Sequence, residues 1–101
     1  MTSELHSLRA ADFTPYLHQF LAIRFTPEVR LEAELIEVKE TENYTGIERT
    51  PFFIVLRTGQ KQGYYPQGIY TVEHPEKGDL HIFLVPLGPD AKGIKYEAVF
   101  S

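Results

Sequence analysis

The alternation of apolar and polar residues predicts a chain made mainly of short β-strands. We predict six of them, over residues 20–25, 29–40, 51–57, 69–74, 79–85 and 94–100. Glycines and prolines cluster between these segments, as is typical of turns. Only the N-terminal part predicts a helix: Thr14 can cap it, Pro15 suits its first position, and Tyr16, Leu17 and Phe20 form its apolar face.

A change of phase inside the second predicted strand indicates a β-bulge or a sharp bend. Apolar residues occupy the odd positions from Val29 to Leu35, whereas Ile36 and Val38 occupy even ones. Because successive strand residues point to opposite faces, one extra residue is needed to keep both sets on the same face. Small barrels use such bulges to turn corners.

The third and fifth predicted strands are apolar at both odd and even positions, which is typical of strands covered on both sides. Six strands joined by short turns predict an all-β fold, an antiparallel meander closed as a small barrel or a two-layer sandwich. We expect one domain over residues 1–101. Residues 1–19 form a short helical segment that plugs one end or lies on one face.

Composition excludes several classes of function. The chain has 101 residues and no cysteine, which excludes disulfides, zinc–thiolate sites and iron–sulfur clusters. Its formal net charge is −4, and residues 28–48 carry most of the acidity. We interpret that stretch as a solvated strand face or as a docking surface for a basic partner. Nucleic acid is not an expected partner, since its binding requires clustered Lys and Arg.

No segment predicts a membrane span or a secretion signal. No apolar run approaches the roughly 20 residues that cross a bilayer, and the first residues lack a basic stretch followed by an apolar one. We therefore expect a cytoplasmic protein. No motif indicates a cofactor or a metal.

The histidines offer one arrangement with chemical potential. If the turn after His74 has four residues, then His74, Asp79 and His81 share one sheet face, where they could bind a divalent ion or transfer protons. A three-residue turn instead sends His81 to the opposite face from His74. We favour a structural His74, hydrogen-bonded beside its turn. A hydrolase using Glu73, His74 or Asp79 is a further alternative.

Three tyrosines in the predicted loops are candidates for an interaction surface. Tyr64 and Tyr65 are adjacent, so in an extended segment their rings point in opposite directions. Tyr44 lies in the other long loop. Tyrosine is enriched where partners bind tightly, but these rings could also fold back as lids over the barrel ends.

The C-terminal third resembles a family of short bacterial proteins of unknown function. Residues 66–100 follow a pattern close to PQGxYxxEHPxxGxxxxFLVPxGPDxxGxxYEAVF, with further similarity at 11–13 and 51–57. The polar residues that match are Glu73, His74, Asp90 and Glu97, and we expect them to tie hairpins together. His81 departs from the pattern. The resemblance also implies an association with phage-tail-collar-like proteins.

These observations support three hypotheses of function. The first is a non-enzymatic interaction or accessory domain of a bacterial or phage-tail-like assembly. Its two doubly apolar strands suggest a homo-oligomer. The second is a barrel that binds a small molecule among its inward aromatic residues. The hydrolase is the third.

Overall fold

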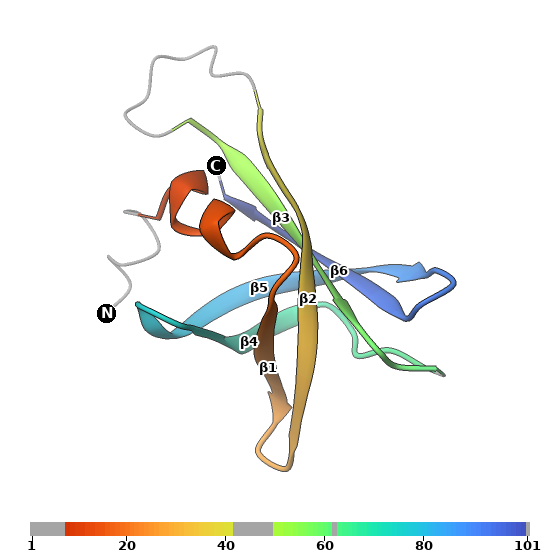
Figure 1. Ribbon diagram of the computed structural model, residues 1–101. Helices are drawn as coiled ribbons and strands as arrows, with labels where there is room; N and C mark the ends of the chain where they lie inside the picture. Colours follow the sequence, from red (N-terminus) through yellow and green to blue (C-terminus); the bar gives the residue numbers. More distant parts are fainter. Residues whose placement is uncertain (1–7, 42–49, 62, 101) are drawn as a thin grey trace.

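The computed structural model is a closed barrel of six antiparallel strands (Figure 1). It describes residues 8–41, 50–61 and 63–100. The strands are β1 (Phe20–Thr26), β2 (Val29–Glu40), β3 (Phe52–Thr58), β4 (Gly68–His74), β5 (Gly78–Pro89) and β6 (Ile94–Phe100). The predicted fold class is confirmed as a barrel. The main difference in bounds is that β5 continues to Pro89, beyond its predicted end at Val85.

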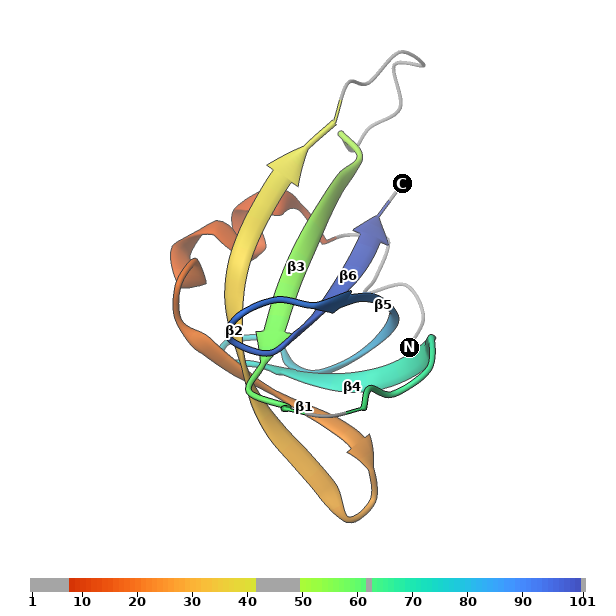
Figure 2. The same ribbon diagram turned by 90° about the vertical axis from the view of Figure 1, so that its right-hand side faces the viewer.

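The strand order is not that of one continuous meander. Around the barrel the strands follow the order β1-β2-β3-β6-β5-β4, and β4 closes onto β1. Each half of the chain is a three-stranded meander, and residues 59–67 connect the two halves. Figure 2 shows β2, β3 and β6 side by side, with β4 crossing at a steep angle. As a result β3 pairs with β6 and not with β4, its neighbour in sequence.

The predicted bulge in β2 is confirmed. The register of β2 against β3 shifts between Leu35 and Glu37, which leaves Ile36 as the extra residue. Leu35 then pairs with Leu56 on one side of the bulge, and Val38 packs against the core on the other. Further bulges occur in β1 and in β5. These irregularities bend the longer strands around the barrel.

One cluster of buried apolar side chains fills the barrel. It takes the inward residues of all six strands, including Ile23, Leu35, Leu56, Leu84 and Tyr96, each less than one-twentieth exposed. The doubly apolar β3 is only partly covered on its outer side. Val55 is buried without belonging to the core cluster, whereas Phe53 is half-buried.

The N-terminal segment plugs one end of the barrel, which is one of the two placements predicted for it. Phe13 is fully buried, and its ring lies 6.0 Å from that of Phe52, 5.9 Å from that of Phe100 and 5.4 Å from that of His74. Burial of a phenylalanine contributes about 2–3 kcal/mol to the free energy of unfolding. This plug therefore fixes the start of the described chain against the ends of β3, β4 and β6.

The predicted short helical segment is present as two successive 3₁₀ turns, η1 (Ala10–Asp12) and η2 (Thr14–Tyr16). Pro15 lies in the first turn as expected, but Thr14 caps no N–H group. Its hydroxyl instead donates to the carbonyl of Ala10 at 2.9 Å. The segment is too short for an α-helix to gain cooperatively from further turns. Phe20, which the sequence placed both on the helical face and at the start of the first strand, begins β1 and is exposed.

Candidate functional site

His74 holds the turn between β4 and β5 against the N-terminal segment. Its side chain is 3% exposed. Nδ1 accepts the backbone N–H groups of Glu76 and Lys77, each at 3.1 Å. Since Nδ1 is the acceptor, Nε2 carries the proton and donates to the carbonyl oxygen of Asp12 at 2.7 Å. The predicted structural role beside the turn is confirmed.

The predicted arrangement of His74, Asp79 and His81 on one sheet face is wrong. The turn has three residues, 75–77, so His74 pairs with Gly78, whose φ of +80° is in the left-handed region that favours glycine. A register change of one residue moves the later side chains to the opposite face. His74 points inward, whereas Asp79 and His81 point outward, and the ring of His81 lies 3.1 Å from the hydroxyl of Thr71.

The same register separates the residues that the hydrolase hypothesis requires. Glu73 and Asp79 are cross-strand neighbours on the outside, and His74 lies on the other face of β4. No carboxylate–histidine pair therefore forms among these three residues. Within the described ranges, no group of three or more His, Asp or Glu side chains is placed to hold a metal ion.

Glu73 lies at the centre of an ion-pair network on the outer surface of β1, β2, β4 and β5. Arg30 donates to both of its carboxylate oxygens at 3.0 Å. Arg24 lies 3.1 Å from Glu73 and also donates to Asp79. The hydrogen bonds from Arg30 lower the pKa of Glu73, against the opposing effect of partial burial. This network ties strands together, as we expected of Glu73.

Asp90 organises the turn between β5 and β6. Its Oδ1 accepts the backbone N–H groups of Lys92 at 2.8 Å and Gly93 at 2.9 Å, and its Oδ2 accepts a hydrogen bond from Arg57. The bond from Lys92 is the largest cause that lowers the pKa of Asp90. Arg57 also donates to Glu34, so Asp90 ties the turn to β3 and β2.

Glu97 differs from the other polar residues of the family pattern. It lies on the outer side of β6, where it pairs in register with Val55 of β3 and Val85 of β5. It is half-buried and forms no ion pair with any residue that the structure describes. The expected hairpin-tying role is not seen for this carboxylate, because both of its cross-strand neighbours are apolar.

The two adjacent tyrosines lie in different environments. Tyr65 folds back as a lid at the second barrel end, where its ring stacks on Phe25 at 4.4 Å and its N–H donates to the hydroxyl of Tyr96. Burial raises the pKa of Tyr96. Tyr64 is 63% exposed, and its role in binding stays a prediction. Tyr44 lies outside the described residues.

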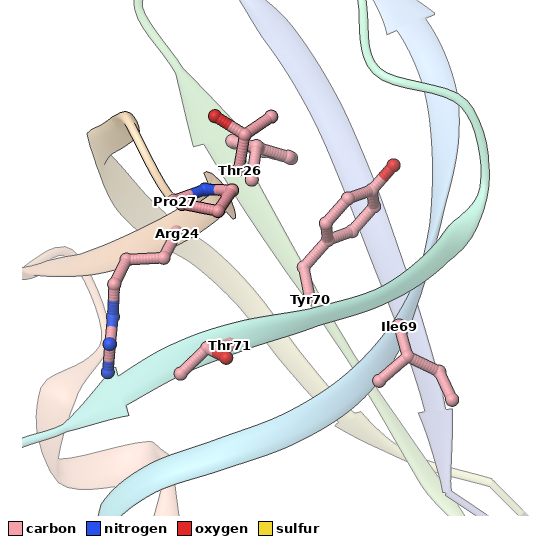
Figure 3. A pocket seen from close by; sticks show the side chains of 7 residues that line it. Arg24, Thr26, Pro27, Ile69, Tyr70 and Thr71 are labelled. Carbon is pink, nitrogen blue, oxygen red and sulfur yellow. The ribbon is translucent and has the colours of Figure 1, made fainter.

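A groove of about 490 Å³ opens where β1 and β4 separate. These strands pair only from Ala22–Glu73 to Arg24–Thr71, and the bulge in β1 follows immediately. Figure 3 shows the lining residues, with Tyr70 and Ile69 pointing to opposite sides of β4. Tyr70 packs edge-on against Phe25 below the groove.

Apolar side chains are exposed on the outside of β4, β5 and β6, three neighbouring strands of the barrel. We call this surface the outer apolar face and define it as Ile69, Phe83, Val85 and Val99. Ile69 is 68% exposed, Phe83 50% and Val99 66%. Ile69 pairs in register with Phe83, and Phe53 pairs with Val99. Exposed apolar patches of this kind are typical of interaction sites.

The sequence patterns indicated the loop tyrosines as interaction residues and did not indicate Ile69 and Val99. For both of these residues the sequence nevertheless contains a sign of exposure. Ile69 has the same parity as Thr71 and Glu73, and Val99 has the same parity as Lys95 and Glu97. An apolar residue in the polar phase of a strand indicates an exposed side chain.

The fold and this face define a small antiparallel β-barrel domain that carries an exposed apolar surface. The chain belongs to the family described as "Domain of unknown function (DUF6916)", whose model matches residues 8–100. Membership of an uncharacterised family, which the resemblance implied, is thus confirmed. No curated protein and no solved structure matches the chain significantly. Within the described residues, no helix is long and apolar enough to span a bilayer.

Proposed function

We propose that this chain is a cytoplasmic protein-interaction domain that binds a protein partner through the outer apolar face. The exposure of Ile69, Phe83 and Val99 is the observation that carries this proposal. Covering each such side chain contributes about 1.5–3 kcal/mol when burial is complete. Burial of these side chains against a partner therefore contributes favourable free energy to binding.

The state of the polar residues supports a role without catalysis. A general base needs a free acceptor atom within reach of a substrate. Both nitrogens of His74 are occupied by backbone groups, and Glu73 and Asp90 accept hydrogen bonds from arginines. We extend the proposal to an accessory role in a bacterial multiprotein or phage-tail-like assembly. That extension rests on the resemblance of residues 66–100 alone.

A photo-crosslinking amino acid placed at Phe83 tests the proposal in cells of the native host. Phe20 is the matched control, because it is 61% exposed but lies at the start of β1, away from the face. We expect a covalent adduct of defined mass at position 83 and none at position 20. The substitution Val99→Ser should remove the adduct. The absence of an adduct at 83, or the same adduct at both positions, would contradict the proposal.

The groove between β1 and β4 favours a second candidate function, the binding of a small molecule. Its volume of about 490 Å³ lies within the range of ligand pockets, roughly 300–1,000 Å³. The inward aromatic residues pack against one another, so a ligand would occupy this groove and not the barrel interior. A fragment screen by NMR should then shift the resonances of Phe25 and Tyr70. A spectrum that no fragment changes would remove this candidate.

A further inference from the structure

We infer that the partner of the outer apolar face binds as an added β-strand along β4, an inference that rests on the proposed function. The added strand lies in the groove between β1 and β4 and pairs with residues 68–70, which we call the open edge of β4. The occupant is an extended segment of another protein, with uncharged apolar side chains where it contacts the groove.

The open edge belongs to a strand that is fully paired on one side only. On its far side, all seven residues of β4 pair with β5. On its near side, the register with β1 ends at the pair of Arg24 and Thr71, so no described residue of β1 pairs with residues 68–70. A strand edge presents backbone N–H and C=O groups that a further extended chain can pair with. The missing neighbour of residues 68–70 is therefore a strand.

β1 does not supply that neighbour, because it is irregular at this point. Its bulge lies between Arg24 and Thr26, and Pro27, just beyond the strand, has no N–H group to donate. The rings of Phe25 and Tyr70 nevertheless stay in contact, with centroids 4.9 Å apart. The groove thus has an aromatic floor between two strand walls, and its volume is about 490 Å³ (Figure 3).

The side chains of β4 indicate which kind of segment fits the groove. Ile69 is 68% exposed on the outer surface, whereas Tyr70 points to the opposite side of the strand. Successive residues of an added strand alternate in the same way. One residue of the segment therefore lies beside Ile69, and the next lies over the ring of Tyr70. Because Ile69 also belongs to the outer apolar face, a strand added here extends that face.

Charge does not select this partner. Arg24 is the charged residue that lines the groove, and it contacts Glu73 and donates to Asp79. Its charge is balanced within the chain, so an acidic or basic segment gains no free ion-pair partner there. The hydroxyl of Thr26 is also engaged, since it accepts the N–H of Glu28. Recognition then depends on backbone pairing and on the apolar contacts.

Selection of random displayed peptides against the folded full chain tests the inference. We expect the selected peptides to share apolar residues at alternate positions. Ile69→Ser should weaken the binding of such a peptide at least about tenfold, and Val99→Ser by less than about twofold. The two residues are a matched pair, 68% and 66% exposed, and of the two Ile69 lines the groove. Circular dichroism should show that both variants fold.

N-methylation of a selected peptide, one residue at a time, tests the backbone pairing itself. An added strand directs the N–H groups of alternate residues toward β4. Methylation at every second position should therefore weaken binding at least about fivefold, and methylation at the positions between them should have a smaller effect. The absence of this alternation would overturn the inference. So would the failure to select any peptide, or binding that Val99→Ser weakens and Ile69→Ser does not.

The crosslink at Phe83 distinguishes failure of this inference from failure of the proposed function. An adduct at position 83 together with strand-like peptide binding supports both. An adduct without such peptide binding keeps the proposed function and overturns the inference, also where small-molecule fragments bind in the groove. The absence of any adduct contradicts the proposed function and, with it, the inference.

Discussion

His74 shows how one side chain can join two distant parts of this molecule. Its ring satisfies two N–H groups of the β4–β5 turn and one carbonyl of the N-terminal plug, all with little exposure to water. A buried polar group without a partner costs about 1–3 kcal/mol. His74 therefore stabilises the fold. Both of its ring nitrogens are occupied by these hydrogen bonds.

The substitution His74→Phe keeps a ring of similar size and removes all three hydrogen bonds. We expect it to lower the free energy of unfolding by about 2–4 kcal/mol, because two donors and one acceptor lose their partner. Urea denaturation at low protein concentration measures the change. His81→Phe is the control, since His81 is exposed, and it should change stability by less than about 0.5 kcal/mol. Equal effects at both positions would contradict this account of His74.

Gly93 is required for a different reason, the close approach of two backbones. A Cβ atom at this position would lie 1.7 Å from the carbonyl oxygen of Thr58, which belongs to the backbone of β3. We expect Gly93→Ala to destabilise the fold by about 1–3 kcal/mol, the usual cost of overpacking. Thermal unfolding checks this. Gly59→Ala, where a Cβ meets nothing within 4 Å, should be nearly neutral; a loss as large at Gly59 would remove the explanation.

The elements were predictable wherever a local pattern decides them. The parity change at Ile36 predicts a bulge because only an extra residue keeps Leu35 and Val38 inward. The length of the turn after His74 was not decided, because Gly78 fits a three-residue and a four-residue turn alike. Thr14 and Pro15 indicated the short helical segment, but such signals do not distinguish a 3₁₀ turn from the first turn of an α-helix.

The turn between β5 and β6 predicts a loss of stability in acid. Hydrogen bonds, first from the N–H of Lys92, hold the pKa of Asp90 below its ordinary value of 3.8 in the folded state. A lowered folded pKa means that the stabilisation is complete above about pH 4 and is lost as the pH falls through the folded value. Denaturation midpoints measured from pH 6 down to pH 2 should show a smaller acid loss for Asp90→Asn than for the parent. Identical profiles would contradict this role.

The fold of the whole molecule depends on local sequence patterns and also on contacts between distant strands that no local pattern specifies. Two three-stranded meanders follow from strand and turn signals along the chain. Their closure depends on the pairing of β3 with β6 and of β1 with β4, between residues more than thirty positions apart in sequence. The outer apolar face lies on β4, β5 and β6, and its assembly depends on the register of β5 against β4, which the sequence leaves open because it does not decide the length of the turn after His74. The parity of Ile69 and Val99 nevertheless marks each of them as exposed.

The photo-crosslink at Phe83 tests the central claim most directly, because it reports whether a partner protein covers the outer apolar face. The account predicts an adduct of defined mass at position 83 and none at Phe20, which is similarly exposed but lies at the start of β1. No adduct at position 83, or the same adduct at both positions, would contradict it.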